Sequence, residues 1–456
     1  MTQITLADHL ANQPGHTLHT YLSAIARQAA DRPSLVKIAG NLAWLFFDKA
    51  FRMGGGLLIN LWLARYLGPE QFGLLNYAIA FVVLFDPVAT LGLNGIVVRD
   101  LVKKPHATTT TLGTAFVLQA IGSVVAVGLI LASIFMLHPE SETTVAVVAV
   151  LSVTLLFQSS SVIKYWFEAQ VQSRYTVAVE NSVFLVAAII RIYLILSEAP
   201  LIAFAWTVLA EAVLNAFGLF AVYAKKTGEL RRWQASAART RVLLADSWPL
   251  ALSGVTILVY MKIDQVMVAQ IAGNEEAGIY SAAVRISELW YFIPTIILAS
   301  TFPYIAKLRS EDSAAENDRW QQLYSLMLWI AVPVSILMTF SSHFLVTLLY
   351  GEAYSAASSV LTIHVWAGIN MGIGSVWSKW MLLENKLKPA LLAYSMGAGL
   401  NVLFNFLLIE RYGAIGAAVA TLLGSWLSAL FGFSLYKPAV TFRFIGKALT
   451  GSKLLS

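Results

Sequence analysis

WLFFDKAFRMGGGLLINLWLARYLGPEQFGLLNYAIAFVVLF is the stretch at residues 44–85 that decides the fold class. Two apolar runs flank a short polar turn, LGPEQFG at 67–73. About 20 apolar residues are enough for a helix to cross about 30 Å of hydrocarbon. Backbone groups in lipid must find hydrogen-bond partners within the segment, so runs of this length form helices. The stretch therefore predicts two membrane-spanning helices joined by a tight turn.

The same pattern continues along the chain of 456 residues. It is 58% hydrophobic and 12% charged, with mean hydropathy +0.70, whereas soluble domains carry about 25% charged residues. Short alternating segments typical of a transmembrane β-barrel are not found. We predict an all-α polytopic membrane protein with about twelve transmembrane helices. The expected spans are 41–64, 75–98, 111–137, 143–166, 176–197, 201–224, 246–271, 279–306, 322–349, 357–383, 389–409 and 414–436.

Lys and Arg are distributed very unevenly between alternate loops. If the N-terminus is cytoplasmic, the inner segments hold 22 of them, whereas the outer loops hold only Arg65 and Arg411. Cytoplasmic loops are the ones enriched in basic residues, so both termini are predicted to be cytoplasmic. This topology rule also accounts for the net charge of +6. No nucleic-acid partner is therefore expected.

The two halves of the chain resemble each other. At an offset of 205, Ala64, Gly68, Glu70, Gly73 and Ala78 match Ala269, Gly273, Glu275, Gly278 and Ala283; at an offset of 214, Trp166, Thr207, Leu209, Phe217 and Gly218 match Trp380, Thr421, Leu423, Phe431 and Gly432. Such repeats predict two six-helix halves of equal orientation with a pathway between them. The expected segments are a polar cytoplasmic extension (1–40), an N-terminal lobe (41–224), a basic cytoplasmic linker (225–245), a C-terminal lobe (246–436) and a cytoplasmic tail (437–456). The extension is either a loose tail or, around 21–30, a short helix on the membrane surface.

Charged residues inside the predicted spans are candidate functional residues. Each costs at least about 2.5–3.5 kcal/mol near the bilayer centre, so each needs a partner or a polar cavity. The bases outnumber the acids, and guanidinium groups match phosphate oxygens, which favours an anionic cargo. The bases are Lys49, Arg52, Lys164, Arg191, Lys262, Arg285 and Lys379, and the acids are Asp48, Asp86, Glu211, Asp264 and Glu288.

Spacing separates these residues into pairs and single charges. Asp48 and Arg52 lie four residues apart, so they form either an ion pair or, with Lys49, one wall of a wet cavity. Arg191 has no acid within one helical turn and is the strongest candidate for a cation that faces a cavity. Lys164 is expected to extend to the inner lipid headgroups.

The second half carries two further groups of charges. Lys262 and Asp264 are two residues apart and point to different helix faces, so we expect no ion pair between them. Arg285 and Glu288 are three residues apart and form a plausible internal pair, and they lie close enough to the outer end for extension to the membrane surface to account for part of their placement.

The runs WLFFDKAFR, WLARYLGPEQFGLLNYA and VVRDLVKKP resemble the Wzx-type polysaccharide flippases of the multidrug/oligosaccharidyl-lipid/polysaccharide exporter superfamily. The resemblance covers about residues 40–440 and implies a two-lobed flippase of the bacterial inner membrane. Such a protein moves undecaprenyl-diphosphate-linked oligosaccharides for surface polysaccharide (O-antigen or exopolysaccharide) by alternating access through a cationic cavity. Only Asp48, Lys49 and Arg52 carry over through a motif.

Charge and resemblance together define the candidate site. We expect Arg52, Lys49, Arg191, Lys262 and Arg285 to bind the substrate. Asp48, Asp264 and Glu288 are candidates for coupling transport to H⁺ or Na⁺. Membrane lipids are expected partners, and the polysaccharide polymerase and chain-length machinery are possible ones.

Other classes of protein fit less well. An ion-coupled drug exporter of the same superfamily would have an acid-rich cavity, and a lipid-linked peptidoglycan precursor flippase would have two more spans. A membrane-embedded sugar polymerase or ligase would need a large outer loop. The chain has no cysteine, no histidine pair at ligand spacing and no GxxxxGKS motif, so neither a metal, a cofactor nor ATP hydrolysis is expected. We therefore expect a transporter and not an enzyme.

Overall fold

The computed structural model describes residues 33–311 and 313–449, so most of the predicted N-terminal extension lies outside the described residues. Helices account for all the regular structure in these two ranges. The N-terminal half contains α3 (Pro33–Val83), α4 (Asp86–Thr90), α5 (Leu93–Lys103), η1 (Pro105–Ala107), α6 (Thr108–Leu137), α7 (Glu142–Ser152), η2 (Val153–Ser160), α8 (Ser161–Ala169), α9 (Arg174–Leu196), α10 (Leu201–Thr227) and η3 (Leu230–Arg232). The C-terminal half contains α11 (Ala237–Ala272), α12 (Asn274–Glu288), α13 (Phe292–Glu311), α14 (Ser313–Tyr350), η4 (Glu352–Tyr354), α15 (Ala357–His364), α16 (Ala367–Leu383), α17 (Leu387–Leu435) and α18 (Pro438–Leu449).

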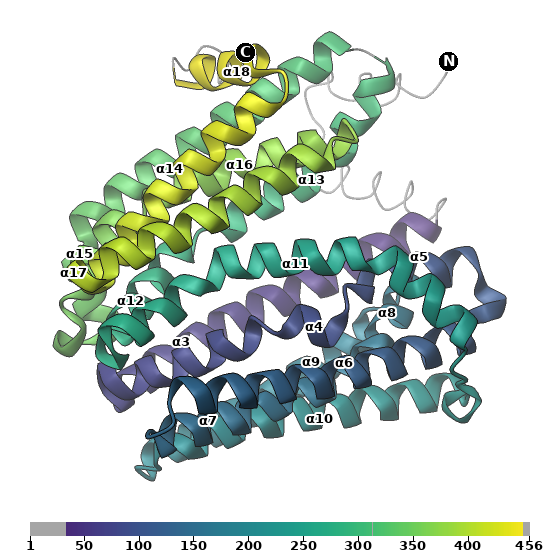
Figure 1. Cartoon of the computed structure of the whole chain (residues 1–456). Helices are drawn as coiled ribbons and strands as arrows, with labels where there is room; N and C mark the ends of the chain where they lie inside the picture. The colour runs from purple at the N-terminus through teal and green to yellow at the C-terminus, as the bar shows by residue number, and fades with distance from the viewer. Residues whose placement is uncertain (1–32, 312, 450–456) are drawn as a thin grey trace, which may run out of the picture.

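The helices form two bundles, and α11 runs along the boundary between them (Figure 1). The tight turns at Gly68, Gly273 and Gly351 lie close together, because Gly73 lies against Asn274 and the Tyr354 hydroxyl bonds to the Ala64 carbonyl oxygen; we call this end of the molecule the turn end. The opposite end carries the linker between α10 and α11, and we call it the linker end.

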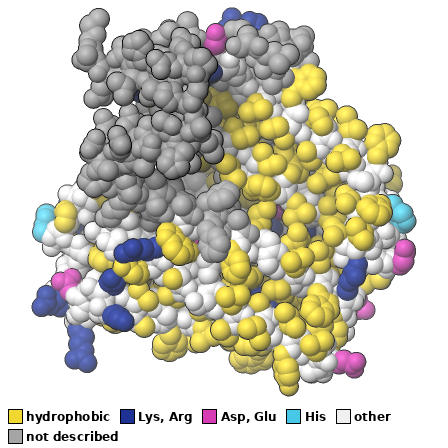
Figure 2. Space-filling view, turned by 180° about the vertical axis from the view of Figure 1, so that it is seen from behind, with side chains coloured by type: hydrophobic (Ala, Val, Ile, Leu, Met, Phe, Trp, Pro, Cys, Tyr) yellow, Lys and Arg dark blue, Asp and Glu magenta, His cyan; other side chains and the backbone are white. Residues whose placement is uncertain are grey.

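Large apolar side chains cover much of the surface (Figure 2). Phe340, Met136 and Leu196 are 88%, 84% and 70% exposed, respectively. Apolar surface of this extent needs a hydrocarbon environment, because soluble monomers rarely expose contiguous patches beyond a few hundred Å². The prediction of an all-α polytopic membrane protein is confirmed.

Within residues 33–311 and 313–449, ten helical segments are long and apolar enough to cross a membrane. The two longest, Phe51–Lys103 with 53 residues and Lys388–Leu435 with 48, each have the length of two crossings. Both are bent at a glycine: Gly68 has φ 70° and Gly413 has φ 54°. Ten segments with two doubled fit twelve crossings, although the number and the direction of each crossing stay predictions.

The turn predicted at 67–73 is much shorter in the structure. The helix breaks only at Gly68 and resumes at Pro69. Proline suits this position, because the first residue of a helix needs no backbone N–H and has the φ that proline fixes. Glycine suits the preceding position, because its φ is positive.

Four spans that the sequence predicts as continuous are interrupted, and the interruptions occur at related places in the two halves. In the first half the breaks fall at 84–92 and at the 3₁₀ segment η2. In the second half they fall at 289–291 and 365–366. The helix before the first break ends at Val83 and its counterpart ends at Glu288, a difference of 288 − 83 = 205 residues. This difference equals the offset of the sequence repeat, so the repeat is also present in the positions where the helices end.

The turn end joins the two halves through a buried core. Gly68 and Gly273, also 205 residues apart, share an extended ψ of 171°. Phe72 packs against the rings of Tyr350 and Tyr354 at centroid distances of 6.3 and 6.1 Å. The Tyr354 hydroxyl donates a 2.8 Å hydrogen bond to the Ala64 carbonyl oxygen. The turn end is therefore closed by contacts between the halves.

Candidate functional site

A cavity of about 350 Å³ lies between the two halves, and we call it the central cavity. Its walls come from α3, α9 and α10 of the first half and from α11 and α12 of the second. The polar side chains that line it are Asn60, Asn76, Arg191, Lys262, Gln265, Ser281, Arg285 and Glu288.

Cations dominate the charge of this cavity. Lys262 and Arg285 line it, and neither has an ion-pair partner within the described part of the chain. Arg191 lines it too, but the Arg191 Nη2 lies 2.5 Å from Glu211 Oε2 on α10. With Glu288 as the lining acid, the formal charge is 3 − 1 = +2, and +1 when Glu211 is included. The cavity is thus suited to an anionic ligand.

The partner of Arg191 corrects one part of the sequence interpretation. The sequence places no acid within one turn of Arg191, which made it look unpaired. Glu211 comes from the neighbouring helix, 20 residues later, and both side chains are mostly buried, at 16% and 22% exposure. An ion pair of this kind offsets the desolvation of both charged groups within the span, and the guanidinium group still lies at the cavity wall.

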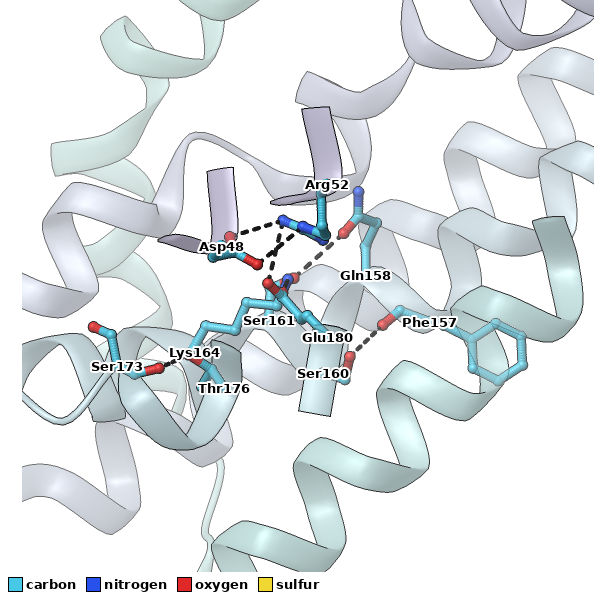
Figure 3. Close-up of polar contacts among 10 residues, drawn as sticks. All are labelled: Asp48, Arg52, Phe157, Gln158, Ser160, Ser161, Lys164, Ser173, Thr176 and Glu180. Atoms are coloured by element: carbon cyan, nitrogen blue, oxygen red, sulfur yellow. Dashed lines mark hydrogen bonds and ion pairs between the residues drawn. The ribbon is translucent and has the colours of Figure 1, made fainter. Parts of the chain in front are cut away.

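Arg52 lies in a different place from the cations of the central cavity. Arg52 and Asp48 on α3 meet Lys164 on α8 and Glu180 on α9, and we call these four residues the charge cluster (Figure 3). Arg52 Nε lies 3.1 Å from Asp48 Oδ1, and Arg52 Nη2 lies 3.4 Å from Glu180 Oε2. Two acids and two bases balance each other here. The side chain of Lys49 lies outside the described residues.

Two further details of the charge cluster differ from the sequence interpretation. Lys164 pairs with Glu180 instead of extending to the lipid headgroups. Glu180 was missed among the acids of the spans, although it lies within the predicted span 176–197 and could have been counted there. The alternative of an ion pair between Asp48 and Arg52 is the one the structure contains.

A second cavity, of about 330 Å³, lies inside the C-terminal half, and we call it the C-half cavity. It is lined by residues of α11, α12, α15, α16 and α17 and by Tyr291, and most of its surface is apolar and aromatic. Asp264 lies at its wall and is 5% exposed. Its Oδ2 accepts a hydrogen bond from the Tyr280 hydroxyl, and its Oδ1 accepts one of 2.8 Å from the Gln265 backbone N–H.

The two cavities adjoin each other. Lys262 lines the central cavity and Asp264 lines the C-half cavity, which confirms that they point to different faces of α11. Glu288 lines both cavities. The expected pair between Glu288 and Arg285 does not reach ion-pair distance among the described residues. Glu288 is instead the side chain that the two cavities share.

Two helical bundles of related architecture, with a charged cavity between them, make this a polytopic membrane protein. Comparison with family profiles is more specific. The profile described as "Polysaccharide biosynthesis protein" matches residues 38–309, and that described as "MatE" matches residues 249–407. The first match covers more than half of the chain. This chain belongs to the polysaccharide biosynthesis protein family, and the resemblance seen in its sequence is confirmed.

Individual relatives are distant. The chain is 26% identical to a "Putative O-antigen transporter" of Shigella dysenteriae over 42% of this chain and 48% of that protein. It is 20% identical to the capsular polysaccharide biosynthesis protein CapF of Staphylococcus aureus over 83% of this chain and 94% of that protein. The match thus spans about half the length of the Shigella protein and nearly all of CapF.

Among solved structures, the lipid II flippase MurJ in an inward closed conformation has a similar fold. The TM-score is 0.67 at 14% sequence identity, over 90% of this chain and 91% of that one. At this identity the likeness concerns the fold alone.

Proposed function

We propose that this protein carries undecaprenyl-diphosphate-linked oligosaccharide repeat units from the cytoplasmic to the periplasmic leaflet of the bacterial inner membrane, for surface polysaccharide. The observation that carries this proposal is the set of three cations, Arg191, Lys262 and Arg285, in a cavity between the halves. A diphosphate diester has about two negative charges at neutral pH, close to the formal charge of the cavity. Arginine also offers phosphate a bidentate pair of N–H donors.

The proposed transport cycle follows from which end of the molecule is closed. The linker end faces the cytoplasm, in keeping with the basic residues there, and the turn end faces the periplasm. The diphosphate enters the central cavity while the polyprenyl chain stays in lipid beside the gap between the halves. Breaking the contacts at the turn end, such as that between Tyr354 and Ala64, then releases the substrate outward.

Glu288 supports a proposal for ion coupling. It lines both cavities, so binding a proton or Na⁺ at this carboxylate raises the charge of the central cavity by one unit. Asp264 is the second coupling candidate, because its carboxylate is held by Tyr280, Gln265 and Thr421 at the wall of the adjoining cavity. Asp48 and Arg52 are neutralised within the charge cluster, so the proposal assigns them a supporting role.

A gene deletion in the source bacterium tests the function whichever sugars the repeat unit contains. Surface polysaccharide should disappear, and the lipid-linked repeat unit should accumulate in the membrane. A plasmid copy should restore the polymer, whereas the double variant Lys262→Gln/Arg285→Gln should not. Lys103→Gln, a change at an exposed lysine of α5, is the matched control and should restore it.

The match to MatE keeps a drug exporter as the second candidate. In that case the deletion strain keeps its polysaccharide and becomes sensitive to cationic drugs such as ethidium. This result would overturn the proposal.

A further inference from the structure

The C-half cavity contains buried polar atoms that have no partner. Asn370 is 6% exposed and Trp377 is 3% exposed, and both line this cavity. The Asn370 Oδ1 and the Trp377 Nε1 have no hydrogen-bond partner within the described ranges. One is an acceptor and the other a donor. Buried polar atoms are normally hydrogen-bonded, so this unpartnered donor and acceptor, on two residues that line one cavity, are available to a ligand that offers both kinds of group.

Other side chains present further acceptors to the same space. The hydroxyls of Ser375 and Ser428 donate to the carbonyl oxygens of Met371 and Ala393, at 2.6 and 2.8 Å. Each hydroxyl proton is therefore in use, and the lone pairs of each oxygen are free to accept. A ligand rich in hydroxyl groups would donate to them.

Aromatic rings form the remaining walls. Tyr260 on α11 and Tyr394 on α17 pack edge to face, with centroids 6.5 Å apart. Trp377 packs edge to face against Phe433 at 6.0 Å. Flat apolar rings combined with a few placed polar groups are typical of sites that orient small organic ligands. Sugar rings match this chemistry, because they have apolar C–H faces and an equatorial rim of hydroxyls.

The position of the cavity fits the order of groups in the proposed substrate. In a lipid-linked oligosaccharide the first sugar is bonded directly to the diphosphate, so a sugar subsite must adjoin the diphosphate subsite. The C-half cavity adjoins the central cavity at Glu288, which lines both. Lys262 and Asp264, two residues apart on α11, face the two cavities.

From these observations we infer that the C-half cavity is a saccharide subsite, which holds the first sugars of the glycan while the central cavity holds the diphosphate. Trp377 and Asn370 bind sugar hydroxyls there, and Tyr260 and Tyr394 lie against the sugar rings. This inference rests on the proposed function and adds to it a site that selects the cargo. A polyprenyl chain in the same cavity would leave the Trp377 and Asn370 atoms without partners, which disfavours it.

The test measures binding to the full-length protein in lipid nanodiscs. The probes are undecaprenyl diphosphate without sugar and the same lipid carrying N-acetylglucosamine or galactose. The wild-type protein should bind at least one sugar-bearing lipid more tightly than the bare lipid. Trp377→Phe keeps the ring stack and removes the N–H donor, so it should raise the Kd of that sugar-bearing lipid about fivefold and leave the bare lipid unchanged.

Two further variants separate binding from folding. Trp380→Phe makes the same change one turn away on α16, where the ring packs against Phe444 and Tyr436 outside the cavity, and should leave every Kd unchanged. Asn370→Leu replaces an unpartnered acceptor by an apolar group of similar size. It should weaken sugar-dependent binding without lowering the melting temperature, because no strong hydrogen bond is lost.

The possible outcomes are distinct. If no sugar-bearing lipid binds more tightly than the bare one, or if neither variant changes its Kd, the saccharide subsite is overturned while the flippase function stands. Equal weakening of the bare and the sugar-bearing lipid would mean that the cavity holds the polyprenyl chain, which also overturns it. If the wild-type protein binds none of these lipids, the proposed function itself fails.

Discussion

Gly73 and Gly278 face each other across the contact between α3 and α12, each against the backbone that precedes the other. A Cβ on Gly73 would overlap the carbonyl oxygen of Asn274, and a Cβ on Gly278 would overlap that of Pro69. The offsets are 278 − 73 = 205 and 274 − 69 = 205, so the contact is reciprocal. A pseudo-twofold axis therefore passes between these two glycines at the turn end, as in a symmetric dimer interface.

Gly278→Ala should loosen this contact, because the neighbouring atoms are backbone and cannot move aside. We expect the turn end to open more often and transport to fall at least tenfold. The chain has no cysteine, so one introduced at Phe72 can report opening through its rate of labelling by a membrane-impermeant maleimide. Gly95→Ala is the control, because a Cβ there meets nothing within 4 Å. Equal labelling rates in Gly278→Ala and wild type would contradict this role of the contact.

Variants of Arg191 and Glu211 can distinguish an effect on folding from an effect on substrate binding in the central cavity. Arg191→Gln leaves the Glu211 carboxylate unpaired in the span and should destabilise the protein by about 2 kcal/mol. The double variant Arg191→Gln/Glu211→Gln should recover most of the melting temperature and none of the transport, because the cation is still absent. Recovery of transport in the double variant would show that the pair has only a structural role.

Substitutions in the charge cluster should change the stability of the protein and leave transport per folded molecule nearly unchanged. Glu180→Gln removes the acid that Arg52 and Lys164 share, and should lower the free energy of unfolding by about 1–3 kcal/mol. Adding Lys164→Gln restores the balance of charge and should restore most of the melting temperature. Ser182→Ala, an exposed change on the same helix, serves as the control. In all three variants, transport per folded molecule should stay within about twofold of the wild-type value. A larger loss of transport would indicate that Arg52 takes part in substrate binding.

The burial of His138 at the turn end predicts that the stability of the protein depends on pH. Burial lowers the pKa of His138 from its ordinary 6.5, and its Nε2 lies 2.7 Å from Gln270 Nε2, which also donates to the Tyr77 hydroxyl. The neutral imidazole is therefore favoured in the folded protein. Its contribution to stability is present above pH 6.5 and is lost as the pH falls through the lowered value. The melting temperature should fall between pH 7 and pH 5, and less so in His138→Gln. The same change at the exposed His106 should leave the profile unaltered.

Local patterns in the sequence predicted the spans and one ion pair. The length of apolar runs is enough to find membrane helices, and a spacing of four residues was enough to suggest the pair of Asp48 and Arg52. The interruptions were not predictable in this way. The segment 153–160 contains neither proline nor glycine, and only Pro87 and Gly92 mark the break in the span predicted at 75–98.

Contacts between helices account for most of what the sequence left undecided in the candidate site. Glu211 and Glu180 neutralise cations on other helices, and no spacing along one helix reveals such partners. The grouping of Arg191, Lys262 and Arg285 depends on how α9, α11 and α12 are placed side by side. For the same reason, Arg52 could not be separated from them by sequence alone.

Helix α11 is tied to the N-terminal half at the linker end, and it also packs against α12 and α17 of the C-terminal half. Arg239 and Asp246 on α11 pair with Asp100 and Arg99 on α5, each at 2.5 Å. Helix α11 therefore contacts both bundles, and any rotation of one bundle against the other must bend it. Pro249, which supplies no backbone N–H, lies just beyond these anchors and before the cavity residues. The flexure would fall there, so the motion that exposes the cargo to one side of the membrane would be set by the stiffness of a single helix.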